Sequence, residues 1–218
     1  MRFLNFLFSG LISGIVLVPL ATISAAQEDS LYVPLYTYRT GPFAPNGSKV
    51  ANGLQAYFET VMKRDGGVEG RVIEWEECEF GYRTDRGVEC YERLKGKNPL
   101  VSNPFSTGLT YKLVPKAPVD KIPVLSMGYG MSGAADGRWF PWVFNFPTSY
   151  WSQASAFIKY VGAEMGGLEN LQDKKIGLIF LESGYGREPI RLFEALGEKF
   201  GYKFKTWAVP AAQMQDQR

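Results

Sequence analysis

Residues 31–77 read LYVPLYTYRTGPFAPNGSKVANGLQAYFETVMKRDGGVEGRVIEWEE and predict one complete strand–helix–strand unit. Residues 31–38 are rich in tyrosine, valine and leucine, which is typical of a strand. The Asn-Gly-Ser triplet of residues 46–48 offers caps to a helix whose apolar residues recur at helical spacing, and the glycine pair at residues 66–67 ends it. A second strand is expected at residues 71–76.

The same alternation of strand and helix signals continues to the end of the chain. Further elements are expected as a helix from residue 84, a short strand at 99–101, a helical turn from 106, a strand at 122–127, an extended aromatic segment at 140–151, a helix from 152, a strand at 176–181, a helix at 189–200 and a strand at 202–209. Such alternation implies right-handed β-α-β units and a parallel, doubly wound sheet.

The extended segment at residues 140–151 divides these units into two groups. We therefore expect two α/β lobes, residues 27–146 and residues 147–218. The strand at residues 176–181 is continuously apolar, which is typical of a strand buried on both faces of a parallel sheet. The second lobe offers two strands, and a two-stranded sheet is marginal without partners. The chain is therefore expected to be a fragment whose second lobe is incomplete.

The N-terminal residues 1–26 have the pattern of a signal peptide. They contain one charged residue, Arg2, then an apolar run without acidic residues, and they end in Ser-Ala-Ala before Gln27. Cleavage after Ala26 and export to the periplasm are expected. An uncleaved membrane anchor is the alternative, which is disfavoured by Pro19 and by the glycines and serines within the run.

The composition excludes several classes of partner. The chain has 24 Lys and Arg against 22 Asp and Glu, without a basic cluster that contains aromatic residues, so we expect no nucleic-acid partner. It contains no histidine, and we expect no metal site and no cofactor. Because export takes Cys78 and Cys90 to an oxidising compartment, we interpret them as a disulfide. A metal or nucleophilic site at these thiols is the less favoured alternative.

Residues 128–133 match the Gly-x-Gly-x-x-Gly pattern of dinucleotide-binding turns and follow a predicted strand. That pattern needs a helix at its third glycine, and the residues that follow are poor helix formers. We interpret the segment as a glycine-rich turn at the carboxyl end of a strand. Open α/β sheets bind ligands at these ends, so the turn is expected to face a cleft.

Two further turns are candidates for ligand contact. Residues 103–108 precede a short helix, where free backbone amides favour an anion and Ser106 or Thr107 adds a hydroxyl donor. A simple helix cap is an equally good interpretation of these residues. Tyr185 lies on the turn after the strand at residues 176–181, where it is either an aromatic wall for a ligand or a cap on the next helix.

Five features of the sequence carry a resemblance to a known family. They are, in chain order, YRTGP at residues 38–42, GGVEG at 66–70, the pair of Cys78 and Cys90, DKIPV at 120–124, and GYGRE at 184–188. Together they resemble the type I periplasmic binding proteins of the branched-chain amino acid family, from about residue 31 to the end. Members of that family are about twice as long as this chain.

The resemblance implies two α/β lobes that close on a ligand, which is then delivered to an ABC permease in the inner membrane. It implies a monomer. It assigns ligand contacts to Ser106 and Thr107, to the backbone of Gly128, Tyr129 and Gly130, and to the aromatic ring of Tyr185. The family has a serine or threonine pattern where this chain has Gly128-Tyr129-Gly130, so the ligand identity stays open.

The function expected from this resemblance is capture of a small amino-acid-like ligand or an amide such as urea. A ligand sensor of the same fold and an exported α/β enzyme are the alternatives. The absence of histidine and of a Gly-x-Ser-x-Gly segment removes the usual hydrolase groups, so we expect a binding protein.

Overall fold

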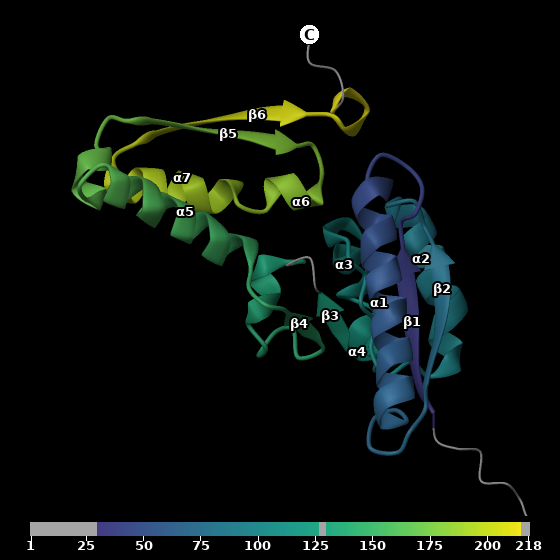
Figure 1. Cartoon of the computed structure of the whole chain (residues 1–218). Coiled ribbons are helices and arrows are strands. Elements are labelled where there is room, and N and C mark those ends of the chain that lie inside the picture. Colours follow the sequence, from purple (N-terminus) through teal and green to yellow (C-terminus); the bar gives the residue numbers. More distant parts are fainter. Residues whose placement is uncertain (1–29, 127–129, 215–218) are drawn as a thin grey trace, which may run out of the picture.

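The computed structural model describes residues 30–126 and 130–214, which alternate strands and helices along the chain (Figure 1). In the first half the elements are β1 (Leu31–Thr37), α1 (Ala44–Asp65), β2 (Ile73–Glu79), α2 (Thr84–Leu94), α3 (Thr107–Leu113), α4 (Ala117–Asp120), β3 (Val124–Ser126) and β4 (Val143–Asn145). In the second half they are α5 (Tyr150–Glu164), β5 (Lys175–Leu181), α6 (Gly184–Arg187), α7 (Ile190–Phe200) and β6 (Lys203–Val209). All paired strands are parallel within the described residues.

The first lobe, which we define as the part built on β1 to β4, contains two pairs of parallel strands. β1 pairs with β2 along its whole length, and β3 pairs with β4. The chain between α2 and α3 joins the two pairs, because Asn103 bridges to Leu35 of β1 and Ser102 bridges to Val124 of β3. The short strand expected at residues 99–101 therefore lies slightly later and is reduced to these bridges.

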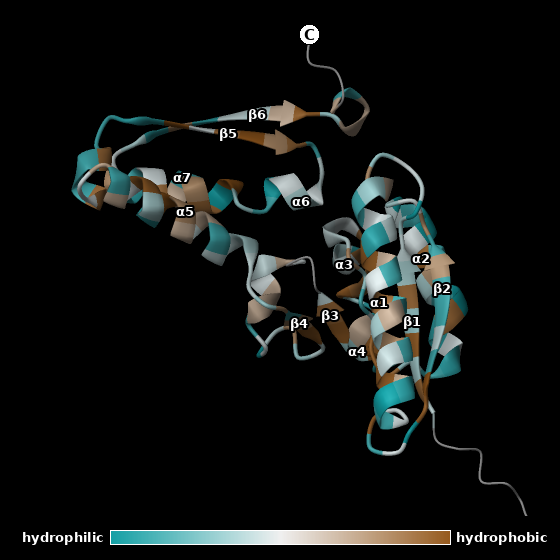
Figure 2. Ribbon diagram, viewed as in Figure 1, coloured by the Kyte–Doolittle hydropathy of each residue, from teal (hydrophilic) through white to brown (hydrophobic). Residues whose placement is uncertain are grey.

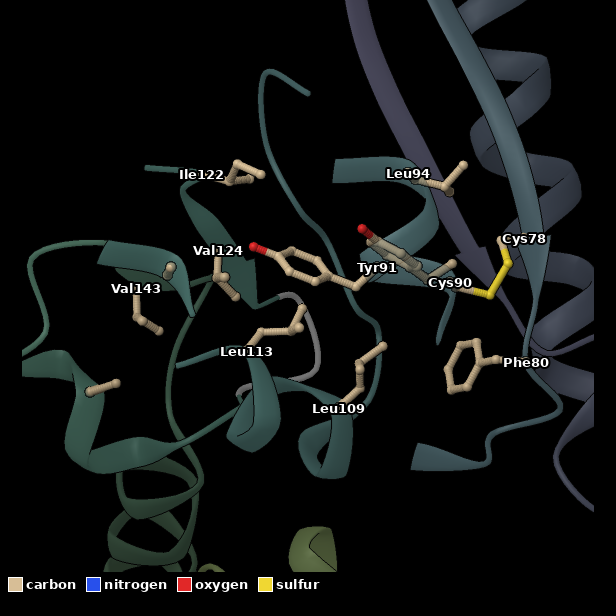
Figure 3. Packing of buried hydrophobic residues seen from close by; sticks show 13 residues of the cluster. Cys78, Phe80, Cys90, Tyr91, Leu94, Leu109, Leu113, Ile122, Val124 and Val143 are labelled. Carbon is tan, nitrogen blue, oxygen red and sulfur yellow. A yellow bond between two sulfur atoms is a disulfide. The ribbon is translucent and has the colours of Figure 1, made fainter. Parts of the chain in front are cut away.

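The core of the first lobe lies between the sheet and helices α2 and α3. Tyr91 and Leu94 of α2, Leu109 of α3 and Val124 of β3 are completely buried in one cluster (Figure 3). The two helices approach closely because α2 has Gly87 where they meet. A Cβ atom added there would lie only 2.8 Å from Cδ2 of Leu109.

The predicted disulfide is present. Cys78 of β2 and Cys90 of α2 are bonded, and their Cα atoms lie 5.8 Å apart (Figure 3). Both residues belong to the first-lobe cluster and are almost fully buried. The bond therefore ties the outer strand β2 to the helix that follows it.

The second lobe, which we define as α5 to β6, consists of two parallel strands with two long helices. β5 pairs with β6 from Lys175 and Lys203 onward. A separate small core, with Ile158 of α5 and Phe193 of α7 among its members, lies between strands and helices. Helix α7 begins after Pro189 and ends at Gly201, as the sequence predicts.

The expectation that β5 is buried on both faces is wrong. Helices α5 and α7 lie on the same side of the two strands (Figure 1). Phe180 points into the lobe and is 8% exposed, while its neighbour Ile179 is 74% exposed. Trp207 of β6 is also exposed on the uncovered side. β5 is apolar along most of its length (Figure 2), but no element of the described chain covers its second face.

Some element boundaries differ from the sequence-based expectation. Helix α1 begins at Ala44 with a proline in its first turn, and residues 46–48 lie inside it, so they are not its caps. Strand β2 runs to Glu79, beyond the expected residue 76. The extended segment at residues 140–151 contains the short strand β4, and α5 begins at Tyr150, capped by the side chain of Ser149.

The expected signal peptide, residues 1–26, lies outside the described residues. Among the helices of the described chain, none has the length and apolar character needed to cross a membrane.

Candidate ligand site between the lobes

A cavity of about 350 Å³ lies where the two lobes meet. Its lining comes from both lobes: Tyr38, Phe43, Asn46, Tyr82, Phe105 and Thr107 from the first, and Tyr150, Leu181 and Tyr185 from the second. A second cavity of about 380 Å³ shares several of these side chains and adds Ser106, Ser183 and Gly184. We call the two cavities together the interlobe cleft. The cleft lies at the carboxyl ends of β1, β2 and β5, where open α/β sheets bind ligands.

Ser106 lies in the cleft lining and caps helix α3. Its Oγ accepts a hydrogen bond from the backbone N of Leu109, at 3.3 Å, and the residue is 3% exposed. The helix-cap interpretation of this residue is therefore realised in the structure. A cap of this kind satisfies one of the free amides at the helix start, and a hydroxyl oxygen can still bond to a second group.

Thr107 is the residue that connects the cleft lining of one lobe to that of the other. Its hydroxyl lies 3.0 Å from the hydroxyl of Tyr150, at the start of α5. Thr107 is 1% exposed and Tyr150 is 6% exposed. Burial raises the pKa of Tyr150 well above its ordinary value, and the hydrogen bond with Thr107 opposes that shift. The phenol is therefore protonated at neutral pH and is able to donate.

Tyr185 lies within the short helix α6 and faces the cleft. Its ring makes an edge contact with Tyr150, with the ring centres 5.4 Å apart. The side chain that caps α6 is Ser183, whose Oγ accepts from the backbone N of Gly186 at 3.3 Å. Tyr185 is therefore not a helix cap, and as a wall for a ligand it stays a prediction.

The glycine-rich turn is only partly described. Gly128 and Tyr129 lie outside the described residues. Gly130 has a φ of 39°, and a Cβ atom added to it would lie 2.1 Å from Oγ of Ser126, so the position requires glycine. Gly130 does not line the interlobe cleft. After it the chain forms a single 3₁₀ turn (Ser132–Ala135) and no α-helix, which does not fit a dinucleotide-binding turn.

The sequence did not predict that five aromatic side chains line the cleft: Tyr38, Phe43, Tyr82, Phe105 and Tyr150. The rings of Tyr38 and Phe43 both contact the ring of Tyr82, at centre distances of 4.9 Å and 4.6 Å. Burial raises the pKa of Tyr82 to about 12. The signal that could have found most of them is their place in the chain, because Tyr38, Tyr82 and Phe105 each follow closely on a segment of the sheet.

The charge of the cleft is small. Among the described residues that line it, Arg83 is the only one that is charged at neutral pH, and its guanidinium pairs with Asp85. An ammonium group would find no carboxylate there within the described chain, whereas a carboxylate or a neutral amide would meet hydroxyl groups. The described residues also contain no cluster of metal-binding side chains.

Comparison with known proteins places the whole described chain in one family. Residues 30–217 match the family described as periplasmic binding protein. Among curated proteins, no sequence matches.

Several solved structures share the fold. A protein of the Pseudomonas fluorescens group, described as an ABC transporter permease, is 36% identical, with a TM-score of 0.71 over 84% of this chain and 45% of its own. A branched-chain amino acid ABC transporter from Thermus thermophilus with bound valine is 18% identical, with a TM-score of 0.73 over 84% of this chain and 46% of its own. A solute-binding protein from R. palustris in complex with benzoate is 18% identical, with a TM-score of 0.68 over 86% of this chain and 50% of its own. This chain thus spans half or less of the length of these proteins.

Proposed function

Because the chain belongs to the periplasmic binding protein family, we propose that it is the substrate-binding component of an ABC importer, which captures a small ligand between two lobes and delivers it to a permease in the inner membrane. The fold is that of a type I periplasmic binding protein whose second lobe is incomplete in this chain. The family is one of binding proteins and not of enzymes, and it implies a location outside the cytoplasm.

The observation that carries the proposal is the convergence of hydroxyl groups and aromatic rings from both lobes on one cleft. Ser106 and Thr107 come from the first lobe, and Tyr150 and Tyr185 come from the second. A cleft that is completed only when both lobes meet encloses a ligand by closure.

The proposed ligand is amino-acid-like or an amide such as urea. A carboxylate or amide group is flat and hydrogen bonding, so it can lie against the rings of Tyr82 and Tyr185 while its oxygen accepts from a hydroxyl. The ligands of two proteins with the same fold, valine and benzoate, both carry a carboxylate. The near absence of charge in the cleft agrees with a neutral amide as well.

The remaining parts of the proposal rest on the sequence. We propose that residues 1–26 are removed on export to the periplasm, that residues 27–146 and 147–218 are the two lobes, and that the protein is a monomer without a cofactor. The Cys78–Cys90 disulfide supports an oxidising compartment.

Titration calorimetry tests this function. The purified protein is titrated with amino acids, small carboxylic acids, primary amides and urea, and one of these classes is expected to bind with one-to-one stoichiometry. Thr107→Val removes the hydroxyl and keeps the shape of the side chain. It is expected to lower the affinity for that ligand about tenfold or more. Thr60→Val is the matched control, because Thr60 is exposed on α1 and its hydroxyl donates to the backbone of Ala56 in the same helix. Equal weakening by both variants, or no binding in any class, would contradict the proposal.

A further inference from the structure

Glu188 follows helix α6 of the second lobe, and its carboxylate reaches the first lobe. Oε1 accepts a hydrogen bond from the hydroxyl of Tyr111 on α3. Oε2 accepts from the backbone N of Ser132, at 3.1 Å. Each of the two oxygens of this side chain is thus bonded to a different segment of the opposite lobe.

The backbone of Glu188 is fixed at the same time from its own lobe. The indole Nε1 of Trp151, at the start of α5, donates to the carbonyl oxygen of Glu188 at 3.2 Å. The carboxylate therefore extends toward the first lobe from a backbone that α5 holds in place.

The two lobes approach each other closely beside this carboxylate. Helices α3 and α6 are in contact, and Figure 1 shows them facing each other. Gly184, the first residue of α6, has no side chain between them. A Cβ atom added to Gly184 would lie 3.2 Å from Cε2 of Tyr111 and 3.8 Å from Cγ2 of Thr107. The same tyrosine that donates to Glu188 thus packs on the backbone of α6.

The chemistry of these bonds favours a strong contact. A carboxylate accepts only, and both donors keep their protons, because an amide does not titrate and burial raises the pKa of Tyr111. The hydrogen bond that Tyr111 donates to Glu188 raises that pKa further. Hydrogen bonds to a charged acceptor are about twice as strong as neutral ones. Separation of the lobes would replace both of them with bonds to water.

We propose that Glu188 is a latch, a positioning residue that holds the second lobe against the first through Tyr111 and Ser132. The proposal rests on the function above, since capture of a ligand in the interlobe cleft requires the lobes to meet. The latch lies beside the cleft and outside its lining. It therefore sets how often the lobes are together without touching the ligand.

The test measures the separation of the lobes directly. Spin labels are placed on Lys49→Cys of α1 and Lys199→Cys of α7, both exposed, and the distance distribution is recorded by double electron–electron resonance without any ligand. Glu188→Gln is expected to lower the ratio of closed to open molecules about tenfold, because it removes the charge and places a donor opposite one of the two donors. Glu182→Gln is the control, since Glu182 pairs with Arg187 of its own lobe.

A double-mutant cycle separates the latch from a general loss of structure. Tyr111→Phe, which removes one hydroxyl, is expected to lower the same ratio of closed to open molecules. The double variant with Glu188→Gln is expected to lower this ratio by less than the product of the two single effects. Identical distance distributions for Glu188→Gln and Glu182→Gln would overturn the proposal. If Glu188→Gln does not fold, as judged by circular dichroism, Tyr111→Phe decides in the same way. Ligand titration and the distance measurement without ligand are separate readouts, so the two proposals can fail separately.

Discussion

The hydroxyl groups of Thr107 and Tyr150 lie 3.0 Å apart, and this contact joins the start of α3 in the first lobe to the start of α5 in the second. Both side chains are almost fully buried, so water cannot easily replace either partner. A ligand that bonds to Thr107 must share its hydroxyl with Tyr150. The two residues thus link ligand contact to the contact between lobes.

Removal of either hydroxyl is expected to destabilise the protein. Thr107→Val and Tyr150→Phe should each lower the free energy of unfolding by about 1 kcal/mol or more, because each leaves the other hydroxyl without this partner. The double variant should lose less than the sum of the two. Urea unfolding measures all three, with Thr60→Val as a control that should change the free energy little. Strictly additive losses would show that the two hydroxyls do not interact in solution.

The disulfide is expected to contribute to the stability of the first lobe. Replacement of Cys78 and Cys90 by alanine should lower the free energy of unfolding by about 3 kcal/mol, as expected for a closed loop of this size. Guanidinium unfolding with and without reductant measures the difference. Reductant should lower the stability of the wild-type protein and leave the double variant unchanged. Rapid alkylation of both thiols in native, unreduced protein would contradict the assignment.

Much of the first-lobe fold follows from local signals in the sequence. Strand β1 and the start of α2 at Thr84 agree with the sequence-based expectation, and so does the end of α7 at Gly201 in the second lobe, because apolar spacing and glycine act over a few residues. The start of α1 was missed because a proline in the first turn begins a helix without a polar cap. The exposed face of β5 could not be predicted, since burial depends on which other segments cover a strand.

The candidate site was harder to predict than the fold. Ser106 as a cap followed from its position before a short helix. Tyr82 and Tyr150 come from distant parts of the chain and meet only because two lobes meet, so no local pattern links them. The contacts of Glu188 with Tyr111 and Ser132 could likewise not be predicted from the sequence, because they cross the boundary between lobes.

The stability of the protein is expected to depend on the ionisation of Glu77. Hydrogen bonds from Arg39, the largest cause, and from Thr37 and Gln55 hold the pKa of this carboxyl below its ordinary 4.5, against the effect of burial. Because the pKa is lower in the folded state, ionised Glu77 stabilises that state above the unfolded pKa. This contribution is lost as the pH falls through the folded pKa.

Comparison of variants over pH tests this dependence. Glu77→Gln should be less stable than wild type at pH 7, and the difference should shrink as the pH falls from about 5 toward 2. Urea unfolding at several pH values measures it. Glu59→Gln serves as the control, because its carboxylate is exposed on α1 and it should behave like wild type at each pH. A difference for Glu77→Gln that persists unchanged at the lowest pH would exclude ionisation as its cause.

Adjacent residues of β5 are expected to differ greatly in their effect on stability. Successive side chains of a strand point to opposite faces, and helices α5 and α7 cover only one of them. Phe180→Ala should lower the free energy of unfolding by about 3 to 5 kcal/mol, because it empties a buried site. Ile179→Lys should change it by less than about 0.5 kcal/mol, because that side chain is 74% exposed.

Both variants are measured by urea unfolding, followed by circular dichroism. Arg187 lies over the ring of Phe180, with 5.6 Å between its guanidinium carbon and the ring centre, so the loss for Phe180→Ala includes this contact. A loss of about 2 kcal/mol or more in the free energy of unfolding for Ile179→Lys would mean that another segment or molecule covers the second face of β5 in solution. A charged side chain costs this much only where it is buried. Equal losses for the two variants would contradict the one-sided packing of the second lobe.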